Sequence, residues 1–137
     1  MPSTLKPYET LADFVTGKEV PDIGAEENRQ VVERLLVEQK GYGRSEIEVE
    51  VPIEMVIDAE IYRSAVDLVV ALRGRRVMAF RCAPGALASY EREIVAAARL
   101  LGRCQIPIAV VSDGKSALVY DTLSGRHIDE GLDAIPA

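Results

Sequence analysis

The chain has no tryptophan, one histidine and two cysteines among its 137 residues. Cys82 and Cys104 are too few for a disulfide framework, and with His127 as the only histidine they do not complete a zinc site. No apolar run approaches the roughly 18 residues of a transmembrane helix, and the N-terminus MPSTLKPYETL lacks the hydrophobic region of a signal peptide. These absences disfavour a secreted protein, a protein with a structural zinc site and a membrane-spanning protein, and they predict a cytoplasmic location.

Basic residues are also scarce, with 16 Lys and Arg against 22 Asp and Glu and a formal net charge of -6. Phosphate contacts need a basic surface, so this balance disfavours a dedicated nucleic-acid-binding protein. The clearest local exception is Arg73, Arg75 and Arg76, which with Gly74 indicate a tight turn between two strands. Such a turn is more often a solvated hairpin tip than a phosphate contact.

Hydrophobic periodicity predicts an α/β domain with a mixed sheet of about four to five strands flanked by two main helices. Nearly continuous apolar strands indicate the sheet centre, because strands covered on both faces lose the polar alternation. The predicted helices are Glu26 to Lys40 and Ala88 to Gly102. The predicted strands are Ile47 to Val56, Ala65 to Leu72, Val77 to Cys82, Ile106 to Val111 and Ala117 to Tyr120.

Length favours a single domain over residues 1–137. Two segments, Asp13 to Val20 and Asp121 to Ile128, each place Thr or Ser and Gly before a basic residue. Glycine permits the positive φ of a bulged turn, so we expect two small hairpins, the first within an N-terminal extension of residues 1–24. The tail of residues 129–137 has no periodicity and is expected to be loosely attached.

The stretch from Ala65 to Pro84 carries part of a nuclease pattern. An aspartate near the start of one strand, followed on the next by an acidic residue and a lysine two apart, is the core of the PD-(D/E)xK nuclease site. Asp67 matches the aspartate, but Phe80 and Cys82 stand where the second carboxylate and the lysine are expected. Residues two apart on a strand share a face, so these positions should converge with Asp67.

Further motifs make the chain resemble the N-terminal nuclease domain of the R subunit of type I restriction enzymes, with a restriction-endonuclease-like fold. Glu26, Arg29 and Gln30 match an E-x-x-R-Q helix, and Gly41-Tyr42 matches a following turn. The family has a later helix with a Q-x-x-x-Y motif; this chain has a predicted helix at the same position but lacks the glutamine and the tyrosine. The remaining correspondences are Phe80 to Pro84 with the E-[CV]-K-A-P strand end, Glu93 and Ala97 with the Q and Y positions, and Pro107 to Tyr120 around Asp113-Gly114 with the terminal strand pair.

The resemblance implies Mg²⁺-dependent phosphodiester hydrolysis. The sequence lacks two of the groups that this reaction needs, the second carboxylate and the lysine. Mg²⁺ prefers carboxylate and water oxygens, whereas Phe80 supplies an apolar ring and Cys82 a soft sulfur ligand. The remnant site of Glu26, Asp67, Phe80 and Cys82 is therefore expected to be inactive, with no metal and no cofactor. Glu26 is equally well explained as an acid in the first turn of a helix. Arg29 is expected to pair with acidic neighbours on its own helix.

Three functions remain open from the sequence. The favoured one is a nuclease-like domain without catalysis that serves as a DNA-associated or protein-interaction module, in which Arg73, Arg75 and Arg76 would make any weak DNA contact. The second is an active Mg²⁺-dependent nuclease whose carboxylate has migrated to Glu91 or Glu93. Arg81 or Arg92 would then replace the lysine. The third is a structural or self-associating protein without nucleic-acid contact, and none of the three involves a membrane.

Overall fold

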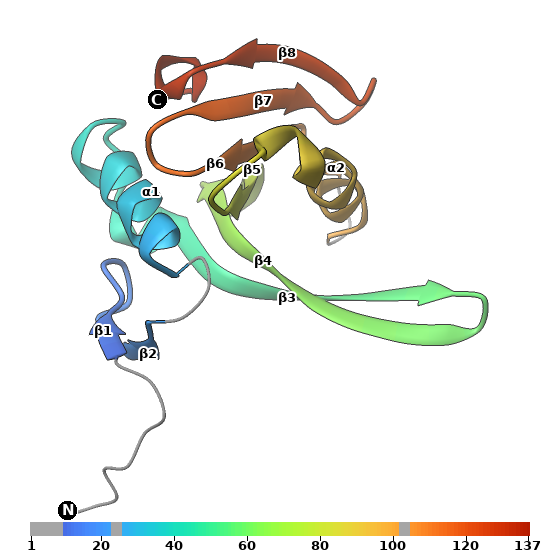
Figure 1. Ribbon diagram of the computed structural model, residues 1–137, viewed down its shortest axis with the longest axis horizontal. Coiled ribbons are helices and arrows are strands. Elements are labelled where there is room, and N and C mark those ends of the chain that lie inside the picture. Colours follow the sequence, from blue (N-terminus) through green and yellow to red (C-terminus); the bar gives the residue numbers. More distant parts are fainter. Residues whose placement is uncertain (1–9, 23–25, 102–104) are drawn as a thin grey trace, which may run out of the picture.

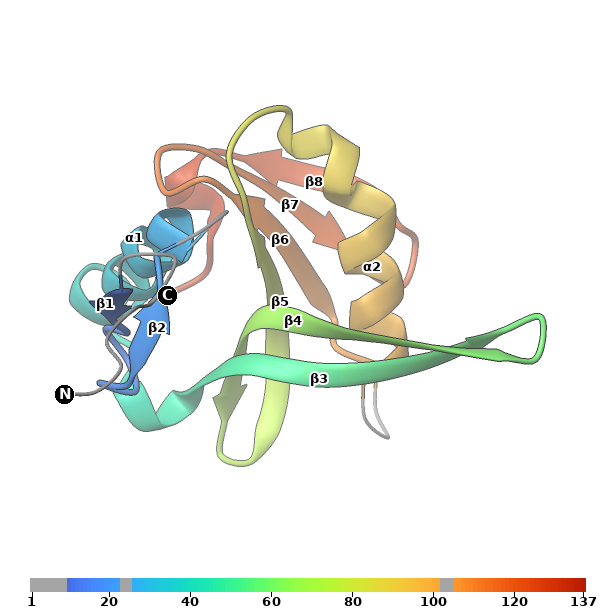
Figure 2. The same ribbon diagram turned by 60° about the horizontal axis from the view of Figure 1, so that its bottom comes forward.

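The computed structural model describes residues 10–22, 26–101 and 105–137. It confirms the α/β prediction, with two helices and a mixed sheet, α1 (Glu26–Glu38) and α2 (Glu91–Leu100) lying on opposite faces of that sheet (Figures 1 and 2). The sheet has six strands rather than four to five. In spatial order these are β3 (Ile47–Ile57), β4 (Glu60–Leu72), β5 (Arg75–Cys82), β6 (Ile108–Ser112), β7 (Ala117–Asp121) and β8 (Arg126–Glu130).

All neighbouring strands are antiparallel except β5 and β6, which pair in parallel from Met78↔Ile108 to Cys82↔Ser112. A parallel pair needs a crossover connection, and α2 lies within it, preceded by a 3₁₀ turn at Leu87–Tyr90. The predicted start of this helix at Ala88 falls in the 3₁₀ turn, and its predicted end at Gly102 lies outside the described residues. Arg103 and Cys104 also lie outside them.

The core has one layer on each face of the sheet, because successive side chains of a strand point to opposite faces. Leu68 and Phe80 pack on the α1 side, and Val69 and Ala79 pack on the α2 side. All four side chains are fully buried. This two-sided burial explains the unbroken apolar runs of β4 and β5.

Strands β4 and β5 separate next to Asp67, at the predicted remnant site. Their pairing begins at Leu68↔Phe80, whereas β3 and β4 remain paired out to Ile57↔Glu60. The outer parts of β3 and β4 therefore form a two-stranded arm that extends away from the rest of the sheet (Figure 2). Asp67 lies at the point where β4 leaves β5.

Both predicted hairpins are present. The first joins β1 (Thr10–Ala12) to β2 (Glu19–Pro21), and the second joins β7 to β8. The C-terminal segment, which was expected to be loosely attached, instead packs on the core: Ile135 is 1% exposed, and the Tyr42 hydroxyl donates a 2.8 Å hydrogen bond to the Pro136 carbonyl. A few irregularly spaced apolar residues, Leu132, Ala134 and Ile135, produce no periodic signal, so the sequence pattern did not reveal this attachment.

Candidate functional site

Asp67 uses its carboxylate to close the gap where β4 and β5 separate. Its Oδ2 accepts a 2.8 Å hydrogen bond from the Cys82 backbone N–H, and the Arg81 Nη1 lies 3.4 Å from the same oxygen. Burial raises the pKa of Asp67, although the Cys82 hydrogen bond and Arg81 both oppose this shift. A carboxylate thus satisfies a backbone donor in a place where the strands are no longer paired.

Phe80 and Cys82 are core residues on the α1 side of β5. Phe80 is fully buried opposite Leu68, and Cys82 is 1% exposed. Burial and the nearby carboxylates of Asp67 and Glu33 raise the pKa of the Cys82 thiol well above its ordinary value, so the thiol is protonated at neutral pH. Asp67 contacts residue 82 through the Cys82 backbone N–H. The side chains of Phe80 and Cys82 offer no oxygen ligand.

Asp67 and Phe80 both line a small cavity beneath α2. Its volume is about 30 Å³, which is enough to admit a water molecule. Arg81 and Glu93 form its polar side, and the remaining lining is largely apolar, from Ile53, Ser64, Ala65, Val66, Ile94 and Ala97. The cavity is too small for a nucleotide.

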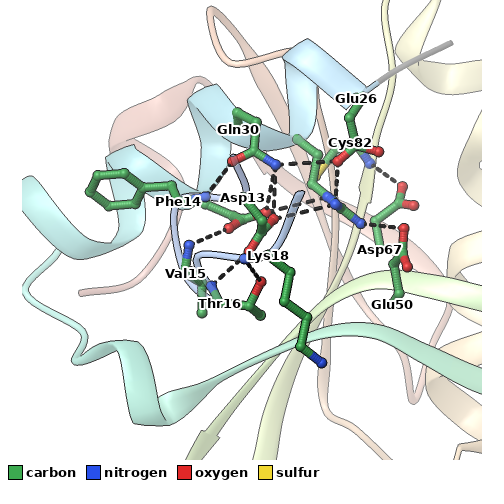
Figure 3. Close-up of polar contacts among 12 residues, drawn as sticks. Asp13, Phe14, Val15, Thr16, Lys18, Glu26, Gln30, Glu50, Asp67 and Cys82 are labelled. Atoms are coloured by element: carbon green, nitrogen blue, oxygen red, sulfur yellow. Dashed lines mark hydrogen bonds and ion pairs between the residues drawn. The ribbon is translucent and has the colours of Figure 1, made fainter. Parts of the chain in front are cut away.

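A second group of acids surrounds Arg29, whose side chain is only 4% exposed. Helical spacing places Glu26 and Glu33 on the same face of α1 as Arg29, and both form ion pairs with it. Two further carboxylates come from other elements (Figure 3): Asp13 in the first hairpin, at 3.3 Å, and Glu50 in β3, at 2.7 Å. One buried guanidinium therefore holds four carboxylates from three elements.

Glu50 reaches Arg29 because the backbone of β3 is irregular at this residue. Its φ is +53°, which is uncommon for a residue other than glycine. The regular pairing of β3 with β4 skips this position, running from Val49↔Leu68 to Val51↔Val66, so Glu50 lies opposite Asp67. The irregularity brings a side chain from an edge strand into contact with α1.

The four carboxylates around one cation differ in protonation. Burial, together with a hydrogen bond to Asp13, raises the pKa of Glu33 to about 8. Burial also opposes ionisation of Asp13, but hydrogen bonds from Glu33, Gln30 and Thr16 outweigh it and lower the pKa of Asp13 to about 2. At neutral pH Glu33 is therefore the neutral acid that donates to an ionised Asp13.

Of the two migrated-carboxylate candidates, only Glu93 is brought to Asp67. Glu93 Oε1 lies 3.7 Å from Arg81 Nε, so Arg81 bridges Glu93 and Asp67 while its guanidinium stacks on Tyr90 at 5.3 Å from the ring centroid. Glu91 and Arg92 line a different surface hollow, which also includes Val95, Ala96, Arg99 and Gly125. The chain thus has a second carboxylate near Asp67, with an arginine between them.

The arginine turn between β4 and β5 is only partly available to a ligand. Arg73 and Arg75 have exposed side chains, and Arg73 adopts a φ of +54° in the tight turn. Arg76 instead forms a bidentate contact with Glu48, with Nε and Nη2 at 2.9 and 2.8 Å from the two carboxylate oxygens. Two of the three predicted DNA-contacting arginines therefore point to solvent.

The sequence pattern led to Glu26, Asp67, Arg81 and Glu93, but not to the hairpin acid. Asp13 lies 16 residues from Arg29, and nothing in its local pattern indicates burial. Glu33 gave a weak signal, because it lies four residues after Arg29 on a helix whose neighbouring Val32 is in the core. Arg29 pairs with its own helix as predicted, and also with two distant elements.

Among the described residues, no group of three or more His, Cys, Asp or Glu side chains is arranged to hold a metal ion. In the same part of the chain, no helix is both long and apolar enough to cross a membrane. The acids near Asp67 are instead contacted by guanidinium groups.

The chain belongs to the family described as type I restriction enzyme R protein N terminus, which matches residues 24–136. The match begins just before α1 and ends after Ile135, so it includes both helices and the whole six-stranded sheet but not the β1–β2 hairpin. No match was found among curated proteins or among solved structures.

Proposed function

We propose that this chain is a nuclease-like domain of the PD-(D/E)xK superfamily that has lost its catalytic activity. It serves instead as an interaction module, in the manner of the N-terminal domain of a restriction R subunit. Its location is the cytoplasm. The observation that carries the proposal is the buried state of Phe80 and Cys82, at 0% and 1% exposure. The family resemblance expects a carboxylate and a lysine at these positions. A hydrolytic site would need both groups to face the substrate.

The arginines give a second reason to expect no metal chemistry. Glu26 is paired with Arg29, and Asp67 is contacted by Arg81. A divalent ion at these carboxylates would have to displace guanidinium groups or lie beside them, and like charges at such short range repel strongly in a partly buried site. The two arginines thus neutralise the carboxylates that the resemblance assigns to metal binding.

Plasmid cleavage tests this proposal. Supercoiled DNA incubated with an excess of the protein in Mg²⁺ or Mn²⁺ should remain supercoiled, and isothermal titration with Mn²⁺ should show no binding at the concentrations that load active nucleases. Divalent-metal-dependent nicking that co-purifies with the protein and persists in an Arg63→Ala control, which alters only the exposed arm, would overturn it.

An active nuclease with a migrated carboxylate is the second candidate, favoured by the position of Glu93 beside Arg81 and Asp67. If this is the correct function, Glu93→Ala should abolish nicking. Glu91→Ala is the matched control, because Glu91 lies on the same helix but lines another hollow. Equal loss in both variants would point to a helix defect rather than to catalysis.

We further propose that any DNA contact is weak, indifferent to sequence and steeply dependent on salt. Only a few exposed arginines on an acidic chain would carry it, and the affinity of such contacts falls with counterion concentration. Replacing Arg73 and Arg75 by alanine should remove a gel shift seen at low salt, whereas Arg76→Ala alone should reduce it less, because Arg76 is paired with Glu48. A shift that survives the double replacement places the contact elsewhere. No shift at low salt in the parent, combined with a dimer on a sizing column, favours the self-associating role.

A further inference from the structure

The β1–β2 hairpin lies beside α1 (Figures 1 and 3), and two polar side chains of that helix form hydrogen bonds with it in addition to the Arg29–Asp13 ion pair and the apolar contact of Val15. Gln30 accepts a hydrogen bond from the Phe14 N–H at 2.6 Å through Oε1 and donates one to Asp13 at 2.8 Å through Nε2. Glu33 accepts a 2.9 Å hydrogen bond from the Val15 N–H. A two-stranded hairpin is marginally stable by itself in water, so these contacts with α1 determine whether it stays in place.

The hairpin brings the Asp13 carboxylate to the cluster around Arg29, where carboxyl groups already outnumber the single guanidinium group. Asp13 is 2% exposed and Glu33 is fully buried, and they lie beside each other with Arg29 as the nearest cation. Two ionised carboxylates cannot share this site without a large electrostatic cost, so docking of Asp13 requires a proton on its partner. The groups around Glu33 are Asp13 from the hairpin, Arg29 and Glu26 from α1, Glu50 from β3, and Cys82 from β5, with Asp67 of β4 beside Arg29 and Cys82.

We propose that the β1–β2 hairpin is a proton-dependent strap, docked on α1 while Glu33 is a neutral acid and released when Glu33 ionises. In the docked state Glu33 donates its proton to the Asp13 carboxylate. Ionisation removes this donor and places two negative charges side by side, and the hairpin can relieve the repulsion by moving away with Asp13. The six-stranded sheet keeps its own pairing, because none of its described strands pairs with β1 or β2, although Val15 of the hairpin leaves the edge of the α1-side core.

The strap covers two residues of the motif helix. Asp13 contacts Arg29 and Gln30, both of which belong to the E-x-x-R-Q motif. The hairpin itself lies outside the region that matches the restriction-subunit family, which begins at residue 24. The hairpin covers part of the motif helix, and its release would uncover Arg29 and Gln30. The pKa of Glu33 in the docked state, raised to about 8, sets the upper end of the transition, because the released side chain ionises at a lower pH.

The absence of tryptophan offers a direct test. The Phe14 ring lies between the guanidinium groups of Arg34 and Arg44, 4.9 and 4.4 Å from its centroid, and an indole favours the same contacts. In a Phe14→Trp background, acrylamide quenching of the single tryptophan should rise about twofold between pH 6 and pH 9.5 as the ring becomes accessible. Because the released Glu33 ionises at a lower pH than the docked one, the midpoint should lie at or below the docked-state pKa of about 8. Far-UV circular dichroism should stay constant over the same range.

Glu33→Gln in the same background mimics the neutral acid and keeps the acceptor for the Val15 N–H, so its quenching should not change with pH. Glu54→Gln is the matched control, because Glu54 is an exposed acid on the distant arm, and it should behave like the parent. The proposal is overturned if Glu33→Gln keeps the transition, or if quenching and circular dichroism change together, which would mean global unfolding. Hydrogen exchange of the peptide covering residues 10–21 in the unmodified chain, corrected for intrinsic pH dependence, provides a check that does not rely on the tryptophan. Unchanged protection of that peptide from pH 6 to pH 9.5 would equally refute the strap.

Discussion

Replacing Arg29 by methionine should destabilise the domain far more than the loss of any exposed ion pair. Methionine keeps an apolar stem of similar length but leaves Asp13 and Glu26 without their cation in a site where Arg29 is 4% exposed. Removing one partner of a buried ion pair typically costs about 3 to 5 kcal/mol. Arg76→Met is the matched control, because its partner Glu48 is 39% exposed and such pairs contribute about 0 to 1 kcal/mol.

Urea unfolding at pH 7 measures both losses, and a second series at pH 4 tests their cause. Without Arg29 the pKa values of the buried carboxylates rise, so lowering the pH lets them take up protons and restores part of the lost stability to the variant. The difference between parent and Arg29→Met should therefore shrink at pH 4. A loss no larger than that of Arg76→Met, or one that is equal at both pH values, would refute the view that Arg29 stabilises the site through its charge.

Three other expectations follow from particular contacts. Phe80→Glu with Cys82→Lys should cost at least the roughly 3 to 5 kcal/mol of a lost buried aromatic, and if positions 80 and 82 converge with Asp67, Mn²⁺ should raise the melting temperature of this variant but not of the parent; a folded variant that ignores Mn²⁺ would show that the ligands do not converge. Because the folded-state pKa of Glu33 is raised from 4.5 to about 8, its contribution to stability is complete below pH 4.5 and is lost as the pH rises toward 8, by up to about 1.4 kcal/mol per pH unit. Urea unfolding of Glu33→Gln should lack this slope, and an unchanged slope would contradict the assignment. Gly114→Ala should lower the melting temperature, because Gly114 has a φ of +89° and an added Cβ would lie 2.5 Å from Val31 Cγ1; an unchanged value would show that the turn can shift away from α1.

The sequence was most informative where a local pattern has a local cause. Continuous apolar residues in β4 and β5 indicated central strands, and Asp67 within them was notable because a carboxylate there needs a partner, which proved to be the Cys82 N–H. The β8 strand escaped the sheet prediction because all of its residues are exposed, so it lacks the alternation of a half-buried strand. Its position at the sheet edge explains that composition.

The Arg29 cluster was less predictable because it depends on three segments that only the fold brings together. Asp13 comes from a turn, and Glu50 comes from an irregular position in an edge strand. A helix pattern identifies i,i+3 and i,i+4 partners, so it reveals Glu26 and Glu33 but not the other two acids. The protonation of Glu33 depends in turn on Asp13, and a sequence pattern contains no information on that distance.

The position of β3 at the sheet edge has a consequence for how the chain could aggregate. It is an edge strand of 11 residues, and a long unpaired edge is a template on which other chains add strands. The glutamates of β3 repel an incoming strand only weakly, because each forms an ion pair with an arginine from another element and its charge is partly neutralised. Pro52 near the middle of β3 lacks an N–H and interrupts the row of donors. Protection against edge-to-edge aggregation therefore depends on Pro52 and on the irregular backbone at Glu50 more than on the acidic character of the strand. The three matched pairs are Glu48 with Arg76, Glu50 with Arg29, and Glu54 with Arg63.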